Sequence, residues 1–269
     1  MEEPIIGPEL GRKIADLQVA AGEIAIWWLG QSSTALKGSD GKILMVDPYF
    51  PTDRPPDQFI FPHPPLRGPD LAADFVFCTH DHRDHTDPEY LLSLLTHHQK
   101  TRLFLTQEGA ERLRAAGAPD DRIQVVKEND SVVIGRVQVT ALASKTAEAS
   151  NTTHLGYVFK FDAGKLWHSG DMMRGITSIP ELMDPVIAQR PDVALLTTTP
   201  DQGGEMEFPP FSEAANLARR IGARVAIPWH YRCFVKRDFD PQGFVAQFRP
   251  GEATKPVVIE FCGYYIYRR

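Results

Sequence analysis

Residues 75–86, FVFCTHDHRDHT, decide how this sequence is interpreted. Residues 75–79 form a short apolar run, typical of a buried strand, and the run ends directly in His80-Asp81-His82-Arg83-Asp84-His85. Three imidazoles and two carboxylates at the end of one strand are costly to pack unless a cation organises them. Imidazole and carboxylate are ligands for zinc, manganese and iron, so this stretch predicts a metal site.

The spacing of these residues predicts where each ligand points. His80 and His82 lie two residues apart, so on extended backbone both can face one side. Asp84 and His85 follow at a turn and can address a second metal position. Other polar residues also follow expected strands, Asp171 after 165–168 and His230 after 225–228. We therefore expect one or two divalent ions, zinc or manganese, to be bound by His80, His82, Asp84, His85, Asp171 and His230.

Length and charge restrict the class of protein. A chain of 269 residues with 42% hydrophobic residues can form one large domain, which we expect to span residues 1–269. The formal net charge of −6 supplies no field that would attract nucleic acid or an anionic membrane. The sequence offers no signal peptide, no membrane span and no cysteine pattern typical of disulfides. These features predict a cytoplasmic protein that acts on a small molecule, and a homo-oligomer is plausible at this size.

Apolar runs and turn residues outline the remaining elements. We expect strands at 24–29, 43–46, 75–79, 102–106, 123–126, 132–142, 155–161, 165–168, 191–196, 225–228 and 257–267. We expect helices at 88–97, 108–116 and 212–221, the first with Asp87 as its N-cap. Residues 24–29 and 43–46 are interpreted as a hairpin. The proline-rich stretch 48–69 is interpreted as an ordered loop long enough to act as a lid.

Strands and helices are mixed in both halves of the chain. This order predicts an α+β fold of two mixed sheets with helices outside, an αββα sandwich, rather than a doubly wound parallel sheet.

The polar motifs, taken in order, resemble the metallo-β-lactamase superfamily. Asp47 after an early strand, the cluster 80–85, the lone Asp171 and the final His230 fill four of its five motifs. Within the superfamily the chain is similar to the L-ascorbate-6-phosphate lactonase branch over residues 22–232. The similar segments are IWWLG at 26–30, THDH at 79–82, YVFK at 157–160, HSGD at 168–171 and IPWH at 227–230.

The sequence departs from the superfamily at its lone third histidine. No histidine occurs between His98 and His154, and Ser144-Lys145-Thr146 stands near the expected place, where the lactonase branch is similarly divergent. The metal position of His80 and His82 should therefore be the weaker one, and a single-metal enzyme is compatible with this sequence. His154 could replace the missing ligand, contact the substrate or be structural.

The resemblance also suggests roles around the ligands. Asp47 and His168 are expected outside the ligand set, Asp47 as a carboxylate that receives the other N–H of a ligand imidazole. Asp84 and Asp171 are the expected catalytic carboxylates, and Asp84 would position the water. An anionic substrate, for example a phosphorylated one, could be held by Arg83, Lys145, Arg174, Arg232 and His154.

Three classes of function fit these residues. In the first, metal-bound hydroxide opens a lactone or carboxylic ester, possible substrates including a phosphorylated sugar acid. The second is a metal-dependent phosphodiesterase, because other superfamily members hydrolyse phosphoesters with the same ligands. The third is a metal-binding protein without catalysis. The resemblance favours the first class, and specificity should lie in the loops 48–69 and 201–211.

Overall fold

The computed structural model describes residues 3–269 and contains two compact units, each built on one sheet. The first unit comprises Met1–Val126, Tyr231–Asp238 and Ile259–Arg269, and the second comprises Lys127–His230 and Phe239–Val258. Each sheet has seven strands and mixes parallel with antiparallel pairs. The predicted α+β class, two mixed sheets with helices, is confirmed. The single domain over residues 1–269 stays a prediction.

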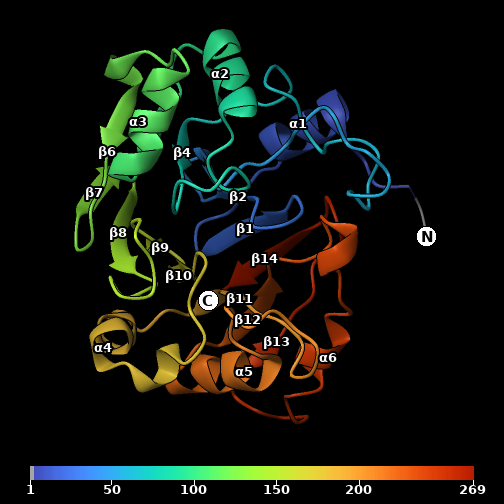
Figure 1. Ribbon diagram of the computed structural model, residues 1–269, viewed down its shortest axis with the longest axis vertical. Coiled ribbons are helices and arrows are strands. Elements are labelled where there is room, and N and C mark those ends of the chain that lie inside the picture. Colours follow the sequence, from blue (N-terminus) through green and yellow to red (C-terminus); the bar gives the residue numbers. More distant parts are fainter. Residues whose placement is uncertain (1–2) are drawn as a thin grey trace. The chain divides into compact units, whose positions relative to one another are not determined.

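The sheet of the first unit has the order β14-β1-β2-β3-β4-β5-β6 (Figure 1). Its strands are β1 (Glu23–Trp28), β2 (Thr34–Lys37), β3 (Ile43–Val46), β4 (Phe75–Phe77), β5 (Arg102–Leu105), β6 (Ile123–Val125) and β14 (Tyr264–Arg268). The pairs from β14 to β3 are antiparallel, and the pairs from β3 to β6 are parallel. Because β3 and β4 run in parallel, both deliver the residues that follow them to the same edge of the sheet.

Three helices cover this sheet and share one apolar core with it. They are α1 (Gly7–Asp16), α2 (Pro88–His97) and α3 (Gln107–Ala115). Leu10 of α1, Leu91 of α2 and Leu113 of α3 are fully buried in the same cluster as Trp27 and Leu103 of the sheet. The range of α2 and its Asp87 cap are as predicted, since the Asp87 carboxylate accepts a hydrogen bond from the Glu89 amide. Burial of this shared apolar surface is the main stabilising term of the unit.

The predicted hairpin between 24–29 and 43–46 is wrong. The strand β2 lies between them and pairs with both β1 and β3, so the three strands form a meander. Because Lys37 is polar, the sequence analysis did not identify this strand. The Lys37 side chain is buried because its ammonium donates to the carbonyls of Ile14 and Ala15 at the end of α1, at 3.2 and 2.6 Å.

The proline-rich loop 48–69 contains no helix or strand, as predicted, but backbone contacts fix it in place. The Ile60 amide donates to the Cys233 carbonyl at 3.0 Å, and the Val235 amide donates to the Gln58 carbonyl at 2.9 Å. Phe59 and Phe234 form a β-bridge between these two bonds. The loop is therefore tied to residues 233–235, which argues against a freely moving lid.

The sheet of the second unit has the order β13-β12-β11-β10-β9-β8-β7. Its strands are β7 (Ser131–Ile134), β8 (Val137–Ala143), β9 (Leu155–Phe161), β10 (Gly164–His168), β11 (Val193–Thr197), β12 (Val225–Trp229) and β13 (Lys255–Pro256). The pairs from β7 to β10 are antiparallel, and the pairs from β10 to β13 are parallel. The ends of β8, β10, β11 and β12 and the start of β9 consequently lie at one edge.

The helices of the second unit are α4 (Pro180–Gln189), α5 (Phe211–Arg220) and the short α6 (Gln242–Val245). Buried residues of these helices, Leu182, Leu217 and Phe244, share one apolar cluster with the sheet residues Trp167 and Leu196. The predicted helix 212–221 is confirmed one residue earlier than expected.

Two predicted strands differ in detail from the structure. The run 132–142 is divided by a turn at Gly135, whose φ is 57°. The run 257–267 is a strand from Tyr264 onward, because Cys262 turns the chain with a φ of 62°.

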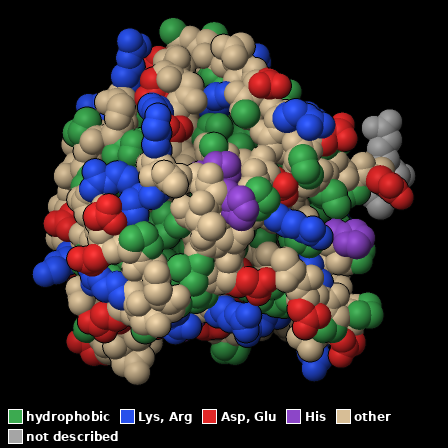
Figure 2. Space-filling model, turned by 90° about the horizontal axis from the view of Figure 1, so that it is seen from above, with side chains coloured by type: hydrophobic (Ala, Val, Ile, Leu, Met, Phe, Trp, Pro, Cys, Tyr) green, Lys and Arg blue, Asp and Glu red, His purple; other side chains and the backbone are tan. Residues whose placement is uncertain are grey.

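The surface mixes charges of both signs. Figure 2 shows Lys and Arg side chains interspersed with Asp and Glu side chains over one face. Within residues 3–269, each helix falls short of the length and apolar character needed to cross a membrane.

Replacing Gly11 with alanine should destabilise the first unit. A Cβ at this position of α1 would lie 1.9 Å from the carbonyl oxygen of Asp70, a backbone atom that cannot turn away. Overpacking of this kind costs about 1–3 kcal/mol. Denaturant unfolding of Gly11→Ala should show the loss, while Arg12→Ala on the exposed side of α1 should not. An unchanged midpoint would contradict this close packing.

Candidate metal centre

The motif 80–85 folds into a compact turn between β4 and α2. The amides of His85 and Thr86 both donate to the carbonyl of His82, at 3.0 and 2.8 Å. The Thr86 hydroxyl donates to the His80 carbonyl at 2.6 Å, and the Asp87 cap then starts α2. These hydrogen bonds hold the backbone of the turn in place. Its side chains can therefore lie close together.

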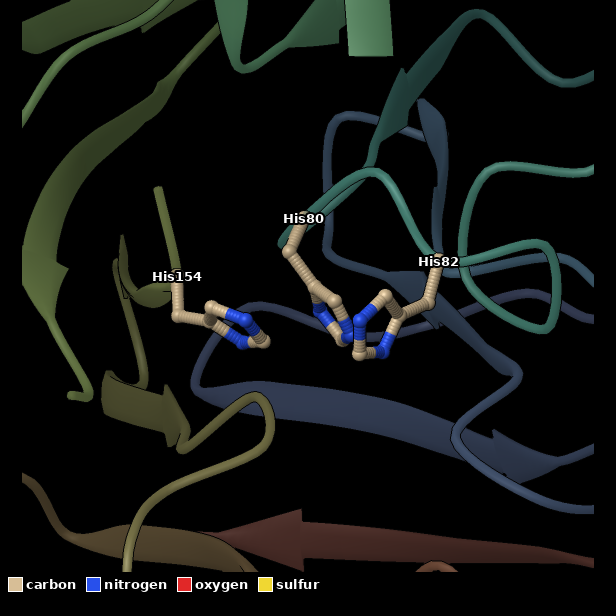
Figure 3. A group of neighbouring side chains, drawn as sticks. All are labelled: His80, His82 and His154. Atoms are coloured by element: carbon tan, nitrogen blue, oxygen red, sulfur yellow. The ribbon is translucent and has the colours of Figure 1, made fainter. Parts of the chain in front are cut away.

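Three imidazoles of this turn lie against one another. The ring centroids of His80 and His82 are 4.5 Å apart, and those of His80 and His85 are 4.0 Å apart. His80 and His85 are fully buried, whereas His82 is exposed. Figure 3 shows the rings of His80 and His82 side by side, and a ring nitrogen of each lies within 4.8 Å of the other. This spacing is suited to shared coordination of a cation.

Asp47 orients the third imidazole. Its fully buried carboxylate accepts from the Thr79 amide and hydroxyl, both at 2.7 Å, and from His85 Nδ1, also at 2.7 Å. A carboxylate only accepts, so His85 carries its proton on Nδ1 and its Nε2 can bind a metal ion. The structure thus places Asp47 where the sequence prediction expects an outer carboxylate.

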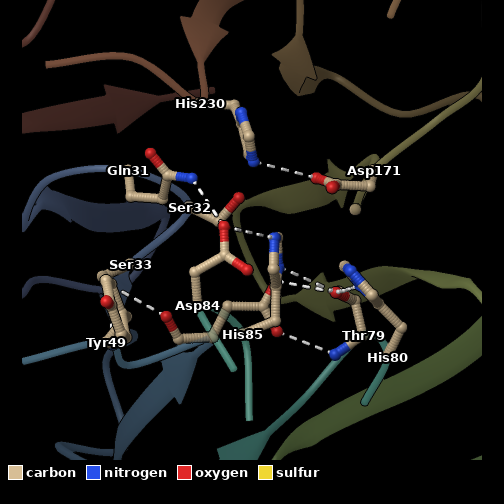
Figure 4. Close-up of polar contacts among 12 residues, drawn as sticks. Gln31, Ser32, Ser33, Tyr49, Thr79, His80, Asp84, His85, Asp171 and His230 are labelled. Carbon is tan, nitrogen blue, oxygen red and sulfur yellow. Dashed lines mark hydrogen bonds and ion pairs between the residues drawn. The ribbon is translucent and has the colours of Figure 1, made fainter. Parts of the chain in front are cut away.

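Gln31 holds the carboxylate of Asp84 and was missed by the sequence analysis. Its side-chain amide donates to Asp84 Oδ2 at 2.9 Å (Figure 4). Gln31 is only 2% exposed, and its backbone is fixed by the Trp28 indole and the Tyr231 carbonyl. Asp84 Oδ2 also lies 3.8 Å from His85 Nε2, so the carboxylate and the imidazole face each other. A glutamine 53 residues away carries no local sequence signal for this contact.

Tyr49 supplies a neutral hydroxyl near Asp84. Burial raises the pKa of Tyr49 to about 12, and the charges of Cys233 and Asp84 act in the same direction. The phenol therefore stays protonated at neutral pH and can donate a hydrogen bond.

The second unit contributes its own pair of donors. Asp171 follows β10 and His230 follows β12, and Asp171 Oδ1 lies 3.4 Å from His230 Nε2 (Figure 4). Each residue is 4% exposed. His230 has a φ of 70°, a rare conformation for a residue with a side chain. Such backbone is found where the surrounding structure holds a functional side chain in place.

Two further histidines lie at the same edge of this sheet. His168 ends β10, and its Nδ1 accepts from the Gly170 amide at 3.2 Å, which shapes the turn that leads to Asp171. His154 precedes β9 and is 4% exposed, and its carbonyl accepts from the Ser144 amide at 3.0 Å. The structure therefore brings His154 and His168 to the strand ends that also carry Asp171 and His230.

The proposed substrate cations have different surroundings. Lys145 has a side chain that is 9% exposed, and its ammonium lies 3.7 Å from Glu207. The Arg174 guanidinium donates to the Phe208 carbonyl at 3.2 Å, beside the same loop. Arg83 is exposed and Arg232 is half-buried. The Lys145 side chain is thus nearly buried, and its ion pair with Glu207 is long.

The donors fit a divalent metal ion. Neutral imidazole and carboxylate suit zinc and manganese, and His85 is already fixed in the tautomer that coordination needs. In the first unit, His80, His82, Asp84 and His85 would supply such donors. In the second unit, Asp171 and His230 offer a carboxylate and an imidazole of the same kind.

The chain is similar in sequence to known metal-dependent hydrolases. A family model described as the Beta-lactamase superfamily domain matches residues 43–231, which include all six predicted ligands. A metal-dependent hydrolase of the UPF0173 group from Cupriavidus taiwanensis is 26% identical over 266 residues, covering 92% of this chain and 88% of the relative. A probable L-ascorbate-6-phosphate lactonase from Salmonella choleraesuis is 25% identical over 280 residues, covering 89% and 78%.

A solved structure shows the same fold. The metallo-β-lactamase fold protein from Bacillus subtilis superimposes with a TM-score of 0.63 at 11% identity, over 92% of this chain and 99% of that one.

Replacing Asp47 with asparagine should weaken metal binding. The change removes the charged acceptor that orients His85, and loss of such a partner typically lowers metal affinity by about 10–100-fold. Chelator competition measures the dissociation constant, with the exposed Asp57→Asn as the matched control. Unfolding of the metal-free variants separates this effect from loss of fold. Equal metal affinity in both variants would show that Asp47 does not affect metal binding through His85.

Proposed function

The chain belongs to the β-lactamase superfamily, and from this membership we propose that it is a metal-dependent hydrolase that opens a lactone or carboxylic ester. The observation that carries the proposal is the turn 80–85, where three imidazoles and Asp84 converge while Asp47 orients His85. The two relatives, a metal-dependent hydrolase and a probable lactonase, support the reaction class. The proposed ligands are His80, His82, Asp84, His85, Asp171 and His230, for one or two zinc or manganese ions.

The bound ion and the protein would have separate tasks. A divalent ion in such a site polarises a carbonyl and makes hydroxide available at neutral pH. We assign Asp84 the tasks of orienting the attacking water and accepting its proton. The hydrogen bond from Gln31 to Asp84 Oδ2 at 2.9 Å supports this assignment, because it holds the carboxylate in place. The Asp84 proton can then pass to the leaving alkoxide. Tyr49 can donate a hydrogen bond nearby, since its hydroxyl stays protonated.

The surroundings of Lys145 favour the binding of an anionic substrate. A buried ammonium is costly unless an opposite charge meets it, and Glu207 at 3.7 Å meets it incompletely. A phosphate or carboxylate of the substrate would complete the pairing with a charge-assisted hydrogen bond. The phosphorylated sugar-acid lactone expected from the sequence has such a group.

Asp84→Asn should reduce kcat by about 10²–10⁴-fold, because the amide cannot accept a proton. The assay compares sugar-acid lactones, aryl carboxylic esters and an aryl phosphodiester, with protein loaded with zinc or manganese. Metal content is measured beside activity. The exposed Asp53→Asn is the control. Faster turnover of the phosphodiester would replace this proposal with a phosphodiesterase, and tight metal binding without turnover would indicate a non-catalytic metal protein.

Lys145→Met should raise KM for anionic lactones by about 10-fold and leave kcat nearly unchanged, because ground-state binding is lost. Neutral lactones should show little change. The exposed Lys160→Met on β9 provides the matched loss of charge. An equal effect of Lys145→Met on charged and neutral lactones would remove its role in anion binding.

A further inference from the structure

The position of His154 in the second sheet gives it a role that neither its sequence motif nor its relatives assign. His154 lies directly before β9, and Leu155, the next residue, is in register with Ala143 at the end of β8. The Ser144 amide donates to the His154 carbonyl at 3.0 Å, which extends the β8–β9 ladder by one step. The backbone of His154 is therefore fixed beside the end of β8.

The same edge of the sheet carries the other donors of this unit. On the far side of β9, His168 at the end of β10 is in register with Tyr157, and Asp171 follows three residues later. His230 follows β12, which runs parallel to β11 and β10. His168, Asp171 and His230 thus lie at or just after the ends of β10 and β12, two strands of this sheet that run in the same direction. His154 is 4% exposed, as buried as Asp171 and His230.

We propose that His154 is a metal ligand, which rests on the proposed function only in requiring that the chain bind a divalent ion. Ser144 occupies the position after β8 and is fully buried, and its hydroxyl is a weaker donor to zinc or manganese than imidazole. A histidine directly before the paired strand reaches the same edge of the sheet. The ligand has therefore moved across one ladder step, from the end of β8 to the start of β9. This accounts for the absence of histidine between His98 and His154.

The move is compatible with sheet geometry. Paired residues of adjacent antiparallel strands have Cβ atoms about 4.5–5.5 Å apart, and an imidazole can bridge that distance. The exchange also means that Ser144, the residue directly after β8, is not required as a metal ligand. In this chain the next residue is Lys145, the enclosed cation that we assign to an anionic substrate. One ladder step thus separates the proposed metal ligand from the proposed substrate contact.

The test measures metal binding directly. His154→Ala should lose one equivalent of zinc, or weaken the dissociation constant at least 10-fold, and should change the absorption bands of the cobalt-substituted protein. The exposed His97→Ala on α2 controls for removal of an imidazole. Unfolding of the metal-free proteins should be the same for both variants. Unchanged stoichiometry, affinity and cobalt bands in His154→Ala would overturn the proposal, whether or not KM changes.

A rescue variant separates coordination from structure. Adding Ser144→His to His154→Ala returns an imidazole to the end of β8, and metal affinity should recover by about 10-fold. Failure of the double variant to bind more metal than His154→Ala would also count against a ligand role. These readouts do not depend on hydrolysis. The protein could bind metal through His154 and yet lack esterase activity. That result would refute the proposed function but not this inference.

Discussion

A buried carboxylate needs hydrogen-bond donors in place of the water it has lost, and Asp47 finds them in Thr79 and His85. All of these contacts join the end of β3 to the end of β4. The Asp47 amide also donates to the Phe77 carbonyl at 3.0 Å, so backbone and side chain act together. The parallel pairing of two short strands thereby determines which nitrogen of a ligand histidine is presented. The orientation of His85, one of the proposed ligands, depends on this cluster of hydrogen bonds.

Unusual backbone conformations occur in both units where polar residues follow strands. Gln31, Asp47 and His230 all have positive φ, between 47° and 70°, although each carries a side chain. Such conformations cost about 1–3 kcal/mol each and persist where neighbouring contacts over-determine them. Gln31 is held by Trp28 and Tyr231, and Asp47 by Ser33, whose hydroxyl donates to its carbonyl at 2.8 Å. Local backbone strain at these three residues therefore accompanies the orientation of their polar side chains.

The sequence predicted the parts of this structure that depend on local pattern. Apolar runs located most strands, and the polar cluster 80–85 located the donors, because both signals lie within a few adjacent residues. The sequence analysis missed α1, α4, α6, β2 and β13, and α4 and β2 show the reason. The helix α4 contains Pro180 and Pro185, which lower helical propensity, and β2 ends in the buried Lys37. Their stability comes from tertiary packing, which a short window of sequence does not contain.

Contacts between distant residues mark the limit of sequence reasoning at the site. The Asp47 role could be anticipated because a carboxylate after an early strand is a motif, whereas Gln31 is an ordinary glutamine until the fold places it against Asp84. The same reasoning explains why the sequence left His154 with three alternatives. Spacing along the chain separates Ser144 from His154 by ten residues, but the β8–β9 ladder makes them adjacent. A ligand set in a sheet is therefore better compared along the edge of the sheet than along the sequence. A donor can change strands there and still reach the same position.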